Sequence, residues 1–225
     1  MKGYGQYCPV AKGAEVFAER WTPLIVRNLY LGAETFSDIL GGVPRMSRTL
    51  LAERLRALER RGVVSREAPP SGRGARYRLT QSGRELADVC LALGTWGARW
   101  LEVTSEERDP FVVLWAWKRY VATERLPAGT TVVRFALTDR PRDRFWLLLS
   151  RAEVEVCTKP PGLDEDLVVT TDCATLVGVH TGRLDAREAE RRGAWNVEGA
   201  ADLVRAFPTW RGPSLFAHVA PARAS

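Results

Sequence analysis

The chain has 225 residues, of which 45% are hydrophobic and 27% are charged, and it carries a formal net charge of +6. This composition excludes a disordered chain and fits one large or two small globular domains. The sequence has no apolar run of about 18 residues and its start has no hydrophobic signal core, so we expect a cytoplasmic protein without a membrane segment.

Residues 9–31 predict two helices that meet near Trp21. Thr22 is the expected cap of the second helix, and Pro23 lies in its first turn, where the missing N–H costs nothing. Gly32 is the expected end of this helix.

The stretch 36–62 predicts two short helices joined by a tight turn, and it reads FSDILGGVPRMSRTLLAERLRALERRG. The second helix is expected over 46–61, with Ser47 as its N-cap and Gly62 as its end. One face of this helix is apolar, and the other is rich in arginine. Such a pair is typical of a helix-turn-helix unit, although an ordinary amphipathic helix pair has the same pattern. The apolar face consists of Leu51, Leu55 and Leu58.

A β-hairpin is predicted directly after this helix, with strands at 63–66 and 75–79 around a Pro/Gly turn at 69–74. A hairpin in this place makes a winged helix. Residues 45–84 contain eleven Arg and three Glu, a local net charge of +8 that exceeds the net charge of the whole chain. Such a concentration of positive charge favours contact with DNA phosphates.

A long helix is predicted from the cap Thr80 to about Glu102. Its apolar residues recur at near-heptad spacing, which is typical of a helix seam. A winged domain of this size cannot cover the whole seam, so we expect part of it to contact a second copy of the chain. The alternative is that the helix packs only within its own chain. The seam consists of Leu86, Val89, Leu93, Trp96 and Trp100.

The first half of the chain resembles the HxlR-type winged-helix regulators, relatives of the MarR group, over residues 7–102. Four motifs carry this resemblance in the same order: Cys-Pro-Val at the start, Trp-Thr-x-Leu-Ile, Ser-x-x-x-Leu-x-x-Arg-Leu, and Tyr-x-Leu-Thr-x-x-Gly after the wing. The resemblance implies a homodimeric transcription factor. It also implies that the first and last helices of the domain form the dimer contact, which adds Phe17 to the interface.

Eight residues are predicted to contact double-stranded DNA. Arg48 and Thr49, near the start of the second helix, are best placed for base edges, and arginine is the commonest reader of guanine. Ser47 either caps the helix or contacts phosphate, and Arg54 either contacts phosphate or forms an internal ion pair. The remaining expected contacts, to phosphate or the minor groove, are Arg45, Arg56, Arg73 and Arg76.

A charged segment ending at Pro110 predicts a domain boundary, giving domains 1–104 and 105–225. The second domain has an α+β pattern, so the chain as a whole belongs to the α+β class. A helix is expected from Pro110, followed by further helices and extended segments. The expected strands are 131–138, 143–150, 154–158, 167–170 and 194–199, and the later helices are a short one after Asp172, 185–192 and 200–207.

The second half resembles the sterol carrier protein type-two fold, on the run DLVVTTDCATLVGVHTGRLDAREAERRGAWNVEGAADLVRAF. This looser resemblance implies an apolar cavity between a sheet and its helices. Six of the eight tryptophans lie at or after Trp100, and aromatic rings make large apolar walls, although they can equally fill a core. We predict that Trp115 and Trp146 contact a small apolar or aromatic effector.

No residue pattern in the sequence predicts an enzyme, a metal site or a cofactor. The two histidines and four cysteines lack metal-ligand spacing, and the nucleophile elbow and phosphate-binding loop motifs are absent from the sequence. We therefore predict a ligand-responsive regulator, most simply a repressor. Two alternatives remain: redox or electrophile sensing through Cys8, as the HxlR resemblance implies, or an apolar-ligand carrier that does not bind DNA.

Overall fold

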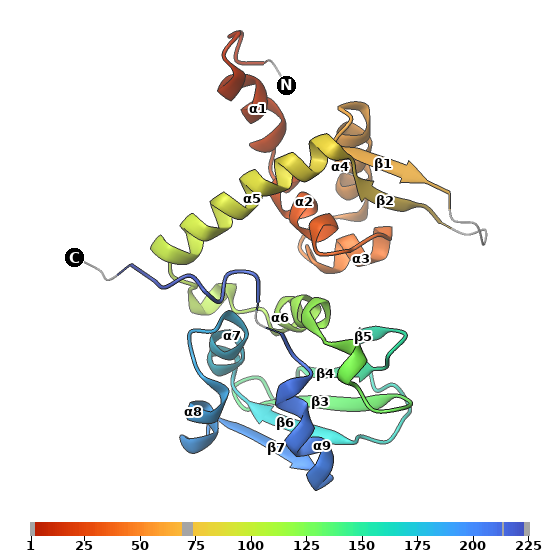
Figure 1. Cartoon of the computed structure of the whole chain (residues 1–225), viewed down its shortest axis with the longest axis vertical. Coiled ribbons are helices and arrows are strands. Elements are labelled where there is room, and N and C mark those ends of the chain that lie inside the picture. Colours follow the sequence, from red (N-terminus) through yellow and green to blue (C-terminus); the bar gives the residue numbers. More distant parts are fainter. Residues whose placement is uncertain (1–2, 69–73, 213, 223–225) are drawn as a thin grey trace. The chain divides into compact units, whose positions relative to one another are not determined.

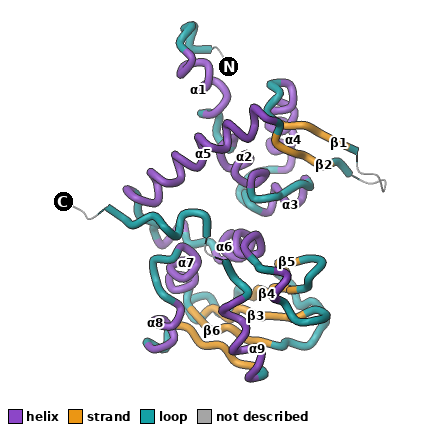
Figure 2. The backbone as a smooth tube through the Cα atoms, viewed as in Figure 1, coloured by secondary structure: helices purple, strands orange, loops and turns teal. Residues whose placement is uncertain are grey.

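The structure is a computed structural model that describes residues 3–68, 74–212 and 214–222. The chain divides into two compact units, Met1–Gly97 and Ala98–Ser225, whereas the sequence predicts a boundary at 104/105. No helix in the described ranges is both long and apolar enough to cross a membrane. Figure 2 shows that strands occur in two places, a two-stranded pair in unit 1 and a larger sheet in unit 2.

Unit 1 consists of helices and one antiparallel hairpin, as the sequence predicts (Figure 1). The hairpin pairs β1 with β2, with Val64 opposite Leu79 and Glu67 opposite Arg76. The elements, in chain order, are α1 (Pro9–Phe17), α2 (Thr22–Tyr30), α3 (Phe36–Gly41), α4 (Arg48–Arg60), β1 (Val64–Glu67), β2 (Arg76–Leu79) and α5 (Gln81–Trp100).

The ends of α4 follow from two residues. Ser47 Oγ accepts the backbone N–H of Leu50 at 3.2 Å, which confirms the predicted N-cap, although the helix begins at Arg48 rather than Met46. Gly62 has a φ of 71°, a left-handed conformation that glycine adopts without steric cost, and the helix ends before it.

The predicted cap of α2 was wrong. Trp21 occupies the cap position with a φ of 80°, and Thr22 is the first residue of the helix, buried and without a capping hydrogen bond. Pro23 lies in the first turn, as predicted. A threonine caps a helix from the extended residue that precedes the first helical turn. Here Trp21 occupies that position in a left-handed conformation, so Thr22 lies one residue too late to act as the cap.

Helix α5 contacts the rest of unit 1 through small residues. A Cβ atom on Gly83 would lie 2.1 Å from the Val63 carbonyl oxygen, so only glycine allows this close approach. Ala87 and Cys90 are buried on the same face, and Thr80 Oγ1 accepts the Gly83 N–H at 3.1 Å, which confirms the predicted cap. The face of α5 that packs within the unit is therefore narrow.

Unit 2 contains one five-stranded mixed sheet and several helices. The sheet order is β5-β4-β3-β6-β7, in which β3 and β6 are parallel and every other pair is antiparallel. Its main elements are α6 (Pro110–Trp117), β3 (Thr131–Leu137), β4 (Arg144–Leu149), β5 (Val154–Cys157), β6 (Leu167–Thr171), α7 (Cys173–Thr181), α8 (Ala186–Arg191), β7 (Trp195–Gly199) and α9 (Ala201–Ala206), with short 3₁₀ turns at Ser105–Glu107, Lys118–Tyr120, Thr123–Arg125 and Phe207–Thr209.

The helices cover one face of this sheet. Val133, Phe135 and Leu137 of β3 alternate toward a buried cluster that includes residues of α6, α7 and α8. Trp117 lies at the centre of that cluster, with ring centroids 5.3 Å from Phe135 and 6.0 Å from Trp195. Buried side chains of the sheet and the helices pack together in this cluster, on the face where the sterol-carrier resemblance implies an apolar cavity.

Candidate nucleic-acid interface

The first turn of α4 presents polar side chains to the solvent. Ser47, Arg48 and Thr49 are all exposed, and the Ser47 hydroxyl is used as the cap. The Arg48 guanidinium lies 5.0 Å from the ring centroid of Phe36 in α3, a cation–π contact that restricts this long side chain. The N–H donors of the Arg48 guanidinium therefore lie beside the start of α4, where a ligand in the solvent can reach them.

The turn between α3 and α4 is held by two polar residues of α2. Asn28 is fully buried, and its amide donates to the Ile39 carbonyl oxygen at 2.9 Å. The guanidinium of Arg27 donates to the Asn28 side-chain oxygen at 2.7 Å and to the Gly42 carbonyl oxygen at 3.0 Å. These bonds satisfy otherwise buried carbonyl groups and so fix where α4 begins.

The remaining arginines of α4 and its preceding turn differ in their surroundings. Arg45 and Arg56 are exposed. Arg54 forms an ion pair with Glu19 at 2.8 Å, with each side chain less than a third exposed. Of the two roles predicted for Arg54, the structure therefore supports the internal ion pair.

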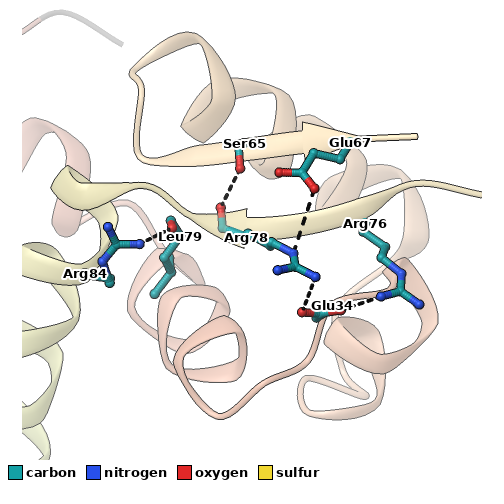
Figure 3. A network of polar contacts seen from close by, with 7 residues as sticks. All are labelled: Glu34, Ser65, Glu67, Arg76, Arg78, Leu79 and Arg84. Atoms are coloured by element: carbon teal, nitrogen blue, oxygen red, sulfur yellow. Dashed lines mark hydrogen bonds and ion pairs between the residues drawn. The ribbon is translucent and has the colours of Figure 1, made fainter. Parts of the chain in front are cut away.

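The exposed face of the wing carries a network of polar contacts (Figure 3). Both arginines of β2 point toward one carboxylate: Glu34 accepts from Arg76 at 3.2 Å and from Arg78 at 3.1 Å. Arg78 also approaches Glu67 across the hairpin at 3.9 Å. The Tyr77 N–H donates to the Glu34 carbonyl oxygen, so the backbone at the start of α3 supports the wing as well. Arg73, another predicted contact, lies outside the described residues.

The predicted apolar seam on α5 is mostly exposed. Val89, Leu93, Trp96 and Trp100 are 46–60% exposed, and they recur at four, three and four residues along the helix. This face is distinct from the one that contains Gly83, Ala87 and Cys90. Leu86 and Phe17 are half-buried, and none of the α1 residues Pro9–Phe17 is buried in the described structure.

A pocket of about 460 Å³ lies on the face of the unit 2 sheet opposite the core cluster. Trp146, one of the two predicted effector contacts, lines this pocket. Trp115, the other, is buried in α6 beneath the Arg119 guanidinium and is not among the lining residues. The lining is mixed rather than apolar, with two arginines and two carboxylates: Arg134, Arg144, Asp143 and Glu165.

Cys8 occupies the N-cap position of α1 and is half-buried. Burial raises the pKa of the Cys90 and Cys173 thiols to about 11, so these two thiols are unreactive near neutral pH. Within the described ranges, no group of three or more His, Cys, Asp or Glu side chains is arranged to hold a metal ion.

The chain is similar to known helix-turn-helix regulators over its first half. Residues 16–105 match the family described as HxlR-like helix-turn-helix. The chain is 34% identical over 99 residues to YvaP of Bacillus subtilis, an uncharacterized helix-turn-helix transcriptional regulator; the match covers 43% of this chain and 92% of YvaP. It is 32% identical to the transcriptional regulator YodB of the same organism, over 42% of this chain and 87% of YodB. The solved structure of reduced YodB superposes on 41% of this chain and 92% of YodB, with 31% identity and a TM-score of 0.36.

The chain belongs to the HxlR family of helix-turn-helix transcriptional regulators. It is a DNA-binding regulator, and unit 1 contains the DNA-binding fold of this family. The family match ends at residue 105, so most of unit 2 lies outside it.

Part of the candidate site of this HxlR regulator was not predicted from the sequence. Arg78 was not selected, although it lies two residues from Arg76 and must therefore share its face of the strand. Glu34, Arg27 and Asn28 were also missed as positioning residues. No local signal marks them, because their partners lie 11 to 44 residues away along the chain.

Proposed function

We propose that this protein is a homodimeric, ligand-responsive transcriptional repressor in which unit 1 binds DNA and unit 2 senses a small molecule. The observation that carries the DNA-binding geometry is the first turn of α4, where Arg48 and Thr49 are exposed beside a capped helix start. In this proposal α4 enters the major groove, and Arg48 reads a guanine. Arg45 and Arg56 contact phosphates, and the wing reaches the adjacent backbone with Arg73 and Arg76.

The homodimer is supported by the exposed apolar face of α5. Isolated apolar side chains are common on protein surfaces, but a continuous stripe at heptad spacing is typical of a helix that packs on another helix. A two-fold dimer places two α4 helices about one helical turn of DNA apart, so the operator is a pseudo-palindrome.

Two observations support the sensor role of unit 2: it lies mostly outside the match to the DNA-binding family, and it contains a pocket. An effector regulates DNA binding only if it binds one arrangement of the dimer better than the other. Helix α5 contains the proposed interface and ends at Trp100, near the division between the units, so it is the proposed route of coupling. The sterol-carrier resemblance of unit 2 remains part of this proposal, supported by its single mixed sheet with helices on one face.

The experiment compares the full chain with a chain that ends at residue 105, in a gel-shift assay with the DNA upstream of its own coding sequence. The shorter chain is a reasonable folding unit because YvaP, which is 92% covered by the match, has little else. We expect both chains to shift the DNA, and only the full chain to release it when cell extract containing the effector is added. Release of the truncated chain by the same extract would show that unit 2 is not the sensor.

Oxidant sensing through Cys8 is the second candidate. The position of Cys8 at the start of α1, where the HxlR resemblance implies a sensing cysteine, favours it. The third candidate, a carrier that does not bind DNA, is disfavoured by the family and by the net charge of +8 over residues 45–84.

A further inference from the structure

The pocket in unit 2 exists because of a short side chain at the centre of a sheet face. In β3, Arg134 and Ala136 point away from the core cluster, since Val133, Phe135 and Leu137 point into it. Ala136 lies opposite Arg144 on β4 and opposite Thr170 on β6. The methyl group of Ala136 thus leaves a hollow between two longer neighbours.

One wall of this hollow is fixed by a chain of hydrogen bonds. The indole N–H of Trp146 donates to Glu165 Oε1 at 2.9 Å, and Arg134 Nε donates to Glu165 Oε2 at 2.6 Å. Burial raises the pKa of Glu165, but these two bonds and the charges of Arg134 and Arg144 outweigh it and lower the pKa overall. Glu165 is therefore ionised at neutral pH, and both of its oxygens are engaged.

Most of the hydrogen-bond donors that remain on the lining belong to the arginines, and the Thr170 hydroxyl is a further one. Arg134 uses its Nε–H for Glu165 and retains the N–H groups of its terminal nitrogens. The Arg144 side chain is exposed and makes no hydrogen bond or ion pair with another side chain in the described ranges. Asp143 is the remaining lining carboxylate, so the uncommitted guanidinium donors outnumber the uncommitted carboxylate oxygens. This balance favours a ligand that brings an anionic acceptor.

The apolar part of the lining favours a flat ligand. Pro141 presents its ring, Trp146 reaches the lining with an indole that is only 3% exposed, and Ala136 and Thr170 form a low floor between them. A volume of about 460 Å³ lies within the usual range for small-molecule sites. A molecule of one or two fused rings fits this space.

We propose that this pocket binds a small aromatic carboxylate, with the carboxylate between Arg144 and Arg134 and the ring against Trp146 and Pro141. The proposal names the ligand class for the sensor role of unit 2 and rests on that role for its link to DNA. Arg144 supplies most of the selectivity for an anion, because Arg134 is already paired with Glu165.

The test is isothermal titration calorimetry, which measures the affinity of the full chain for 2-naphthoate and for 2-naphthamide, a neutral molecule of the same shape. We expect 2-naphthoate to bind roughly tenfold to a hundredfold more tightly, the difference that one charged hydrogen-bonding group makes. Arg144→Gln is expected to remove this preference. Arg142→Gln, an exposed arginine outside the lining, is the matched control and is expected to bind like the parent chain.

Equal affinity for the acid and the amide, or unchanged binding by Arg144→Gln, would overturn the proposal. A gel shift with the same two molecules separates it from the sensor role. Binding of 2-naphthoate without release of DNA supports the site and contradicts the sensor role. Release of DNA by cell extract but not by 2-naphthoate, with no naphthoate binding, contradicts the site alone.

Discussion

The tryptophans of α5 and those of the unit 2 sheet and its helices have opposite surroundings. Trp96 and Trp100, on the last turns of α5, are 53% and 60% exposed, whereas Trp115, Trp117, Trp146, Trp195 and Trp210 are each at most 4% exposed. A tryptophan side chain left in water exposes a large apolar area, which is unfavourable, so most tryptophans are covered by their own chain or by another molecule. The exposed α5 face supports the proposal that a second copy of the chain covers it, whereas the unit 2 tryptophans are buried within their own unit.

The arginines of unit 1 differ in their partners. Arg48, on the first turn of α4, is exposed and lies against the Phe36 ring, whereas Arg54 pairs with Glu19 and the two exposed arginines of β2 pair with Glu34. Exposed ion pairs contribute little stability, so Glu34 affects chiefly the direction of the wing arginines. In the proposed complex, DNA phosphates therefore have to compete with Glu34 for the two arginines of β2.

The largest expected effect concerns the α5 face. Leu93→Asp places a carboxylate in the proposed helix seam, where it has no partner and is desolvated, so we expect the dimer to be lost. Multi-angle light scattering measures the mass directly. Ala92→Asp, one residue earlier and outside the seam, is the control and is expected to leave the mass unchanged. A folded dimer of Leu93→Asp would mean that this face is not the interface.

The second effect concerns the self-contained core of unit 2. Burial, together with the nearby Arg211 charge, lowers the pKa of His180 to about 4 from its usual 6.5. Between these values the unfolded chain binds a proton that folded unit 2 does not, so stability is complete above about pH 6.5 and falls toward pH 4. The loss amounts to up to about 3 kcal/mol.

Chemical unfolding at pH 7 and pH 4.5, followed by tryptophan fluorescence, measures this loss. His180→Gln is expected to lower stability at pH 7 but to reduce its dependence on pH. The exposed His218→Gln is the control and keeps the full dependence. An unchanged pH dependence in His180→Gln would show that His180 is not protonated on unfolding in this range.

A third prediction addresses the exposed arginines of α4. Arg48→Ala is expected to weaken specific DNA binding by about 1–3 kcal/mol and to relax the preference at one base position. Gel-shift titration at fixed salt with operator variants measures both quantities. Arg205→Ala, which removes an exposed arginine of α9, is the control for the change of charge. If the Arg48→Ala footprint and affinity matched those of the parent chain, α4 would not lie in the groove as proposed.

The smallest expected effect concerns Cys8. Cys8→Ser is expected to retain DNA binding and the response to the effector, with the response to oxidants as the one property that can be lost. Gel shifts with effector and with diamide separate these properties. Loss of the effector response in Cys8→Ser would place the sensor in unit 1 rather than unit 2.

Sequence reasoning succeeded where the signal lies within a few residues. Ser47, Thr80, Asp109 and Asp172 each cap the predicted helix, because a cap bonds to an N–H only two or three residues ahead. The strands of unit 2 were predicted for the same reason, because the alternation of apolar and polar side chains along a strand is visible between adjacent residues. Thr22 failed as a cap because the left-handed turn at Trp21 has no sequence signature.

The sequence by itself determined the winged helix-turn-helix, the heptad face of α5 and the α+β class of unit 2, all of which follow from periodicity, capping and local charge. Only the tertiary structure decided that Arg54 pairs with Glu19 and that Glu34 holds both β2 arginines. It also decided that the pocket lies on the sheet face opposite the helices, where Ala136 of β3 faces Arg144 and Thr170. These outcomes depend on side chains that are distant along the chain and meet only after the strands and helices have packed.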